Sequence, residues 1–309
     1  MKKSFWNKIK RLKRYLPLYL MMLPGVLYII INNYIPMAGL RIAFKQFNYA
    51  KGISGSKFVG LKNFEFLFKT KDAFVITRNT LCYNVVFICL GTLLAITVAI
   101  LLNDIRNIRW KKLYQTVILI PFLISIVIVS YLVYAFLSAD TGFINNSILR
   151  PLGLEPVSWY STPAYWPVIL VLVNLWKGFG YTSIIYFATL VGIDRGYFEA
   201  AAIDGASRWQ QITNVTLPCL KPTIITLTLM SIGRIFYSDF GLFYQVPMNS
   251  GLLIDVTNTI DTYVYRGLIS LNNVSMASAA GFYQSIVGFL LVLTANFIVK
   301  RVSAENSLF

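Results

Sequence analysis

Long apolar runs alternate along this chain with shorter segments rich in charge, proline and glycine. A helix crosses the hydrocarbon core of a bilayer in about 17 to 25 residues, and each run has about that length. The pattern therefore predicts an all-α membrane protein with six transmembrane helices. The expected spans are residues 16–38, 80–102, 114–137, 165–190, 223–240 and 277–299. We expect Pro121 to kink the third span.

The first apolar run follows a basic segment, since residues 2–14 carry seven Lys or Arg and no acidic residue. This arrangement resembles a signal peptide, but no small-residue cleavage site ends the run and further runs follow it. We therefore interpret residues 1–15 as a basic cytoplasmic tail and residues 16–309 as the membrane domain. Six spans place both termini in the cytoplasm.

The distribution of Lys and Arg agrees with this orientation. The predicted inner segments hold 16 of these residues and the predicted outer segments hold 9, which has the sign expected of cytoplasmic loops. Residues 39–77 weaken the bias, because they contribute seven of the outer nine. A long first loop is translocated largely regardless of its charge, so the orientation stands.

Composition excludes several classes of protein. The chain is 57% hydrophobic and 13% charged, with a mean hydropathy of +0.64, which excludes a soluble globular domain. Its net charge of +16 is better explained by anionic membrane lipid and topology than by nucleic-acid binding. There is no histidine, and the three cysteines have neither CxxC nor zinc-site spacing. We expect no metal site, no cofactor and no catalytic residue in this chain.

The segment between the fourth and fifth runs, residues 192–222, is polar and helix-prone. Ala200, Ala201 and Ala202 favour a helix and leave room for a partner to approach its backbone. Gly205 can adopt left-handed angles, end this helix and let a second one leave at an angle. Pro218 and Pro222 are expected to interrupt the helix before the next span. Spacing alone is also compatible with a plain loop helix between two spans.

This segment resembles the EAA signature of ABC importer permeases, EAA-x3-G-x9-I-x-L-P, with Val215 in place of Ile. The resemblance implies a type I permease fold in which this loop is the cytoplasmic coupling helix that contacts an ATP-hydrolysing subunit. The residues to which it assigns that contact are Glu199, Ala200, Ala201, Asp204, Gly205, Ala206, Arg208, Leu217 and Pro218. For Arg208, and for Trp209 beside it, a structural role at the membrane boundary is equally compatible with the sequence.

Three further segments, Trp176–Leu190, Thr259–Leu268 and Ala279–Arg301, resemble the LplB-like permeases within the MalF/MalG-type carbohydrate family. The resemblance implies uptake of oligosaccharides or polysaccharide fragments across a bacterial cell membrane. It also implies a second homologous permease, two ABC ATPase subunits and an extracellular lipid-anchored sugar-binding protein as partners. ATP and Mg²⁺ would then be bound by the ATPase, since this chain has no phosphate-binding loop motif.

Charged residues within the predicted spans, Lys177, Arg234 and Asp239, require an explanation. An unpaired charge at the centre of a bilayer costs about 3 kcal/mol, so these side chains should face the bundle interior, a water-filled path or the second permease. Sugars are held by aromatic faces, amides and charges. The candidate residues for a substrate path are Asn174, Trp176, Lys177, Tyr181, Arg234, Tyr237, Asp239 and Gln284. Packing or an interfacial aromatic belt explains any single one of them equally well.

Two other functions remain open at this point. An ion-coupled secondary transporter would show inverted repeats and intramembrane carboxylates, whereas we find no repeat and only Asp239 as a carboxylate within a predicted span. A membrane glycosyltransferase would need clustered catalytic groups, which the sequence lacks.

Overall fold

The computed structural model describes residues 2–302 and is almost entirely helical, which confirms the predicted all-α class. Its helices are α1 (Lys2–Ile29), α2 (Ile35–Met37), α3 (Gly52–Gly55), α4 (Glu65–Lys69), α5 (Lys71–Asp104), α6 (Ile108–Leu123), α7 (Ile126–Leu137), α8 (Trp166–Val191), α9 (Arg195–Ile203), α10 (Arg208–Gln211), α11 (Leu217–Ile232), α12 (Phe240–Gln245), α13 (Ile254–Thr257), α14 (Ile260–Ile269) and α15 (Val274–Val302). The strands β1 (Lys45–Gln46) and β2 (Lys57–Phe58) pair antiparallel.

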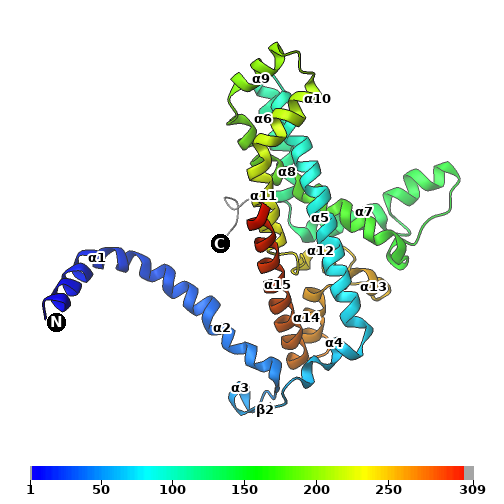
Figure 1. Ribbon diagram of the computed structural model, residues 1–309. Coiled ribbons are helices and arrows are strands. Elements are labelled where there is room, and N and C mark those ends of the chain that lie inside the picture. The colour runs from blue at the N-terminus through cyan, green and yellow to red at the C-terminus, as the bar shows by residue number, and fades with distance from the viewer. Residues whose placement is uncertain (1, 303–309) are drawn as a thin grey trace.

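Within residues 2–302, five helical segments are long and apolar enough to cross a membrane, and a bent pair would make a sixth. The five are Tyr15–Phe44, Lys71–Asp104, Pro163–Val191, Arg208–Ile232 and Val274–Arg301. All but the first gather into one elongated bundle, with α9 and α10 at one end and α3, β2 and α4 near the other (Figure 1). The first segment extends away from this bundle.

The bundle is held by close packing of α5 on α8 and α11. Ala95 and Ala99 of α5 are fully buried against Tyr186 and Leu190 of α8 and Leu220 of α11. Because alanine is small, the helix axes approach closely and the larger side chains fill the space between them. A second cluster around Trp166 packs α12 against the outer part of α5 and α8.

The third expected span differs from the prediction. Instead of one helix kinked at Pro121, the chain forms α6 and α7, which meet at 93°. The break lies at Ile124 and Ser125, whose backbones are extended, three residues beyond the proline. Pro121 thus lies in the last turn of α6, where a missing N–H donor weakens the helix just before it ends.

The fifth expected span, residues 223–240, has different bounds from the helix found there. Helix α11 begins at Leu217, directly after a π-helical turn at Ile212–Thr216, and it continues through Pro222. Pro218 and Pro222 therefore do not interrupt the helix. At its other end the helix stops at Ile232, not near residue 240, because the chain turns at Gly233 and then enters α12.

The contact between α6 and α8 depends on Gly180, and this generates a prediction. A Cβ atom at Gly180 would overlap the backbone carbonyl of Ile118 on α6. Gly180→Ala should therefore lower the free energy of unfolding by about 1–3 kcal/mol, measured by thermal or denaturant unfolding in detergent. Gly178→Ala is the matched control, since no heavy atom lies within 4 Å of its added Cβ. Equal stability of the two variants would contradict this packing.

Candidate coupling surface and translocation cavity

Residues 192–222 form what we call the coupling segment. It begins with α9, whose start and end are both set by local signals. Asp194 caps its first turn, because its carboxylate accepts a hydrogen bond from the Gly196 N–H at 2.9 Å. At the other end Gly205 adopts φ +77°, Ala206 N–H bonds to Ala201 C=O at 2.9 Å and Gly205 N–H bonds to Ala202 C=O at 3.1 Å. These two bonds define a Schellman motif. The turn predicted at Gly205 is therefore present.

The second helix of the segment, α10, is fixed to the bundle. Ser207 and Gln210 form a capping box at its start. Arg208 then makes an ion pair with Asp104, the last residue of α5. Because both side chains are partly exposed, this pair adds modest stability. It nevertheless joins the coupling segment directly to the longest helix of the bundle.

Three large apolar side chains are exposed at this end of the molecule, and we call these residues together the coupling surface. They are Tyr197, Ile203 and Trp209, whose exposed fractions are 62%, 86% and 71%. Of the residues that the EAA resemblance selects, Glu199, Ala200, Asp204, Gly205, Arg208 and Pro218 are exposed, and Ala201, Ala206 and Leu217 are partly buried. Leu217 and Pro218 belong to the start of α11.

A polar cavity of about 530 Å³ lies between α5, α8, α11 and the turn that follows α11. Its wall consists of Asn84, Phe87, Ile88, Gly91, Thr92, Asn174, Leu175, Gly178, Phe179, Thr182, Ser231, Arg234, Tyr237, Ser238 and Asp239. The structure thus brings together four of the residues predicted for a substrate path: Asn174, Arg234, Tyr237 and Asp239. The other four, Trp176, Lys177, Tyr181 and Gln284, do not line this cavity.

The turn at residues 233–239 forms one wall of the cavity and is held by side chains from three other helices. Asn84 donates to the carbonyls of Ile235 and Tyr237, at 2.9 Å each. Gln284 donates to Phe236 C=O at 2.9 Å and to the Asp261 carboxylate at 3.1 Å. The same Asp261 oxygen accepts from the Ser238 N–H and hydroxyl. Gln284 therefore positions the wall and is not part of it.

Asn84 and Asp261 were missed by the sequence analysis. Asn84 is a polar residue within an otherwise apolar stretch of α5, and that contrast is the signal that could have identified it. Asp261 lies in the first turn of α14, where a carboxylate is ordinary. Nothing in its local sequence indicates that it binds a turn more than twenty residues earlier.

Arg234 and Asp239 lie outside any membrane-spanning helix, contrary to prediction. Arg234 follows the end of α11, and Asp239 caps α12 by accepting from the Leu242 N–H at 3.1 Å. Both lie in the wall of the same cavity, but within residues 2–302 they form no ion pair with each other.

Lys177 does not line the cavity. Its side chain binds backbone carbonyls at the break between α6 and α7. Its ammonium group donates to the carbonyls of Ile124 at 2.7 Å, Phe122 at 3.1 Å and Pro121 at 3.5 Å. These carbonyls lie at the C-terminal end of α6, where a cation is favoured. The Pro121 carbonyl also accepts the Ile124 N–H at 3.4 Å, so the carbonyls that depend on Lys177 are those of Phe122 and Ile124. Tyr181 lies one turn further along α8 and stacks on Phe122, with ring centroids 4.7 Å apart.

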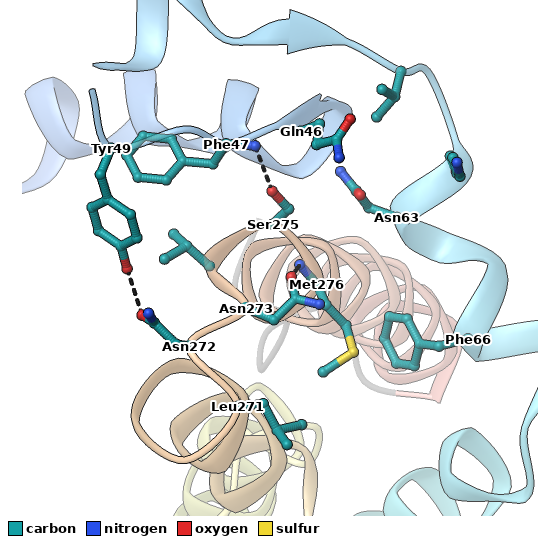
Figure 2. A pocket seen from close by; sticks show the side chains of 13 residues that line it. Gln46, Phe47, Tyr49, Asn63, Phe66, Leu271, Asn272, Asn273, Ser275 and Met276 are labelled. Carbon is teal, nitrogen blue, oxygen red and sulfur yellow. Dashed lines mark hydrogen bonds between the residues drawn. The ribbon is translucent and has the colours of Figure 1, made fainter. Parts of the chain in front are cut away.

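A second polar pocket, of about 510 Å³, lies where the first helical segment joins the bundle. Figure 2 shows two of the hydrogen bonds across it, from Tyr49 O–H to the Asn272 side chain and from Phe47 N–H to Ser275 Oγ, each 2.8 Å long. The Asn63 amide is also engaged, since it donates to Ala43 C=O and Lys45 C=O at 2.9 Å. The hydrogen bonds across this pocket therefore hold the chain that follows the first segment against the start of α15.

For Lys177 we predict a structural effect. Lys177→Met would leave the carbonyls of Phe122 and Ile124 at the end of α6 without their donor, and each such group costs about 1–3 kcal/mol. The variant should unfold at a clearly lower temperature in detergent. Lys112→Met is the control, since it removes an exposed Lys of α6. A Lys177→Met variant as stable as the control would show that water or lipid head groups satisfy these carbonyls.

Residues 88–304 match the family described as "Binding-protein-dependent transport system inner membrane component". Protein LplB of Bacillus subtilis (strain 168) is 35% identical, over 96% of this chain and 92% of its own. The polygalacturonan/rhamnogalacturonan transport system permease protein YteP of the same organism is also 35% identical, over 94% of this chain and 89% of its own.

Solved structures agree with the sequence relatives. A crystal structure of a bacterial ABC transporter involved in the import of the acidic polysaccharide alginate contains a chain that is 33% identical. It superposes with a TM-score of 0.88 and covers 96% of this chain and 99% of that chain. This likeness confirms the expected permease fold and favours an ABC permease over an ion-coupled secondary transporter. The chain is a membrane-spanning permease that belongs to the binding-protein-dependent transport system inner membrane component family.

Proposed function

We propose that this chain is one permease half of an ATP-driven importer of oligosaccharides or polysaccharide fragments. The names of its relatives support a carbohydrate substrate, since they include transport permeases for polygalacturonan/rhamnogalacturonan and for lactose. The cavity supports it too, because its wall carries amides, hydroxyls and aromatic rings. Such groups bind sugar hydroxyls and the faces of sugar rings.

The coupling surface is the single observation that carries this proposal. Ile203 and Trp209 are the most exposed large apolar side chains of the coupling segment, and they lie in the segment whose EAA resemblance implies an ATPase contact. Their exposure supports a contact with a partner at this end of the bundle. We propose that this surface fits a groove on an ABC ATPase subunit, and that a second such subunit contacts the second permease. The ATPases would hold ATP and Mg²⁺.

We further propose that the first helical segment packs against a second, homologous permease. The most apolar window of Tyr15–Phe44 has no buried residue in this chain, and the segment extends away from the bundle (Figure 1). A permease of the same family would offer it an apolar helical surface, with lipid covering the remainder. The basic residues 1–15 would then lie at the cytoplasmic surface, with both termini on that side of a bacterial cell membrane.

Transport would follow an alternating-access cycle. Closure of the ATPase pair would push on the coupling segment, and the Arg208–Asp104 pair and the continuous α11 would carry that motion to the bundle. Helix α11 is 16 residues long, so the motion would reach the cavity wall about 24 Å away. A binding protein on the outer side would deliver the sugar to Asn174, Arg234, Tyr237 and Asp239 in that wall.

Ile203→Glu tests the coupling surface. A charge at this position cannot enter an apolar groove, so the variant should recover at least tenfold less ATPase subunit than the native chain in a pull-down from solubilised membranes. Ile269→Glu places the same charge at an exposed position of α14 (67% exposed), far from the coupling surface, and should recover the native amount. Undiminished recovery with Ile203→Glu would place the ATPase elsewhere. Failure of the native chain to recover any ATPase would contradict the proposed function.

A further inference from the structure

Arg234 is a positive charge without a partner in the cavity wall. Its side chain is exposed and lines the cavity together with Asn174. Within residues 2–302, its guanidinium group has neither a hydrogen-bond acceptor nor an ion-pair partner. A guanidinium group carries five N–H donors and does not lose its charge. Five donors are thus available to whatever enters the cavity.

The depth of Arg234 excludes a lipid head group of the inner leaflet as its partner. Helix α11 rises for about 24 Å between the coupling segment and the turn that carries Arg234. The hydrocarbon core of a bilayer is about 30 Å thick, so with α11 along the membrane normal Arg234 lies about 6 Å inside the opposite boundary. An arginine inside the hydrocarbon core normally marks a pairing partner or a ligand path.

The remaining groups of the wall fit the uncharged parts of a sugar. Asn174 and Thr182 on α8 supply uncharged donors and acceptors for hydroxyl groups. Tyr237 supplies an aromatic ring in the same wall. Asp239, the carboxylate among the residues of the wall, already accepts the Leu242 N–H at 3.1 Å.

We propose that Arg234 binds a carboxylate of the substrate, so that the imported sugar is an oligosaccharide of uronic acids. Guanidinium and carboxylate groups match in a two-pronged hydrogen-bonded pair, whose geometry makes the contact both stronger and more specific than a single hydrogen bond. This inference rests on the proposed function, since it specifies the substrate of the same cavity.

Equilibrium dialysis of labelled sugars against the purified membrane complex, without the separate binding protein, tests this proposal. The probes are tetrasaccharides of galacturonate, guluronate and mannuronate, each compared with the same sugar whose carboxyl groups are reduced to alcohols. At least one acidic tetrasaccharide should bind the native complex about 10- to 100-fold more tightly than its reduced form. Arg234→Gln should abolish this preference and leave binding of the reduced sugar within about twofold.

Two further variants keep the test specific. Arg234→Lys retains the charge without the planar fork and should retain part of the preference. Lys221→Gln removes one positive charge from the same helix, outside the cavity wall, and should retain all of it.

Four results would overturn the proposal. In the first, the Arg234→Gln variant still binds the acidic sugar more tightly than its reduced form. In the second, the native complex binds the acidic and reduced sugars with equal affinity. In the third, Arg234→Gln weakens the binding of both sugars by the same factor, which would place Arg234 against the second permease. If the native complex binds neither form of any sugar, the carbohydrate substrate proposed above fails as well.

Discussion

A break in a helix exposes backbone carbonyl and amide groups, and inside a membrane no bulk water is available to satisfy them. This chain has two such breaks, between α6 and α7 and between α11 and α12, and α12 packs against α7. At both breaks, side chains of other helices donate hydrogen bonds to the exposed backbone carbonyls. Lys177 donates at the first break, and Asn84 and Gln284 donate at the second. The bundle is stable with interrupted helices only because these polar side chains lie on its continuous helices, α5, α8 and α15.

The same constraint accounts for the cavity. Where α11 stops at Ile232, the chain turns aside and leaves space between α5 and α8 that no helix fills. The groups that hold the turn also set the shape of the cavity wall, so a movement of α5 or α11 must change that wall. Both helices connect to the coupling segment, α11 by continuity and α5 through the pair of Arg208 and Asp104. In the proposed mechanism, a movement of the coupling surface therefore changes the cavity wall.

Local signals in the sequence predicted the features that depend on local structure. The length of the apolar runs indicated the long helices, and Gly205 indicated the turn after α9, since a left-handed residue there needs no distant partner. The two helix breaks depend on distant partners, and the sequence did not show them. Lys177 binds carbonyls more than fifty residues earlier, and Asp261 holds the turn at Ser238. For that reason Arg234 was expected inside a helix, whereas it lies in the turn that follows α11.

The most direct test of the account is whether ATP changes the cavity through the coupling segment. Asn174→Cys, in a chain whose native cysteines are replaced by alanine, would report access to the cavity by its rate of labelling with a membrane-impermeant maleimide. In the assembled importer, we predict that trapping the ATPases with ATP and vanadate changes this rate severalfold. We also predict that Gly205→Val, which forces a branched side chain into a left-handed backbone, removes the effect. The account would be contradicted by a labelling rate that is the same with and without ATP and vanadate, or by an ATP effect that persists in Gly205→Val.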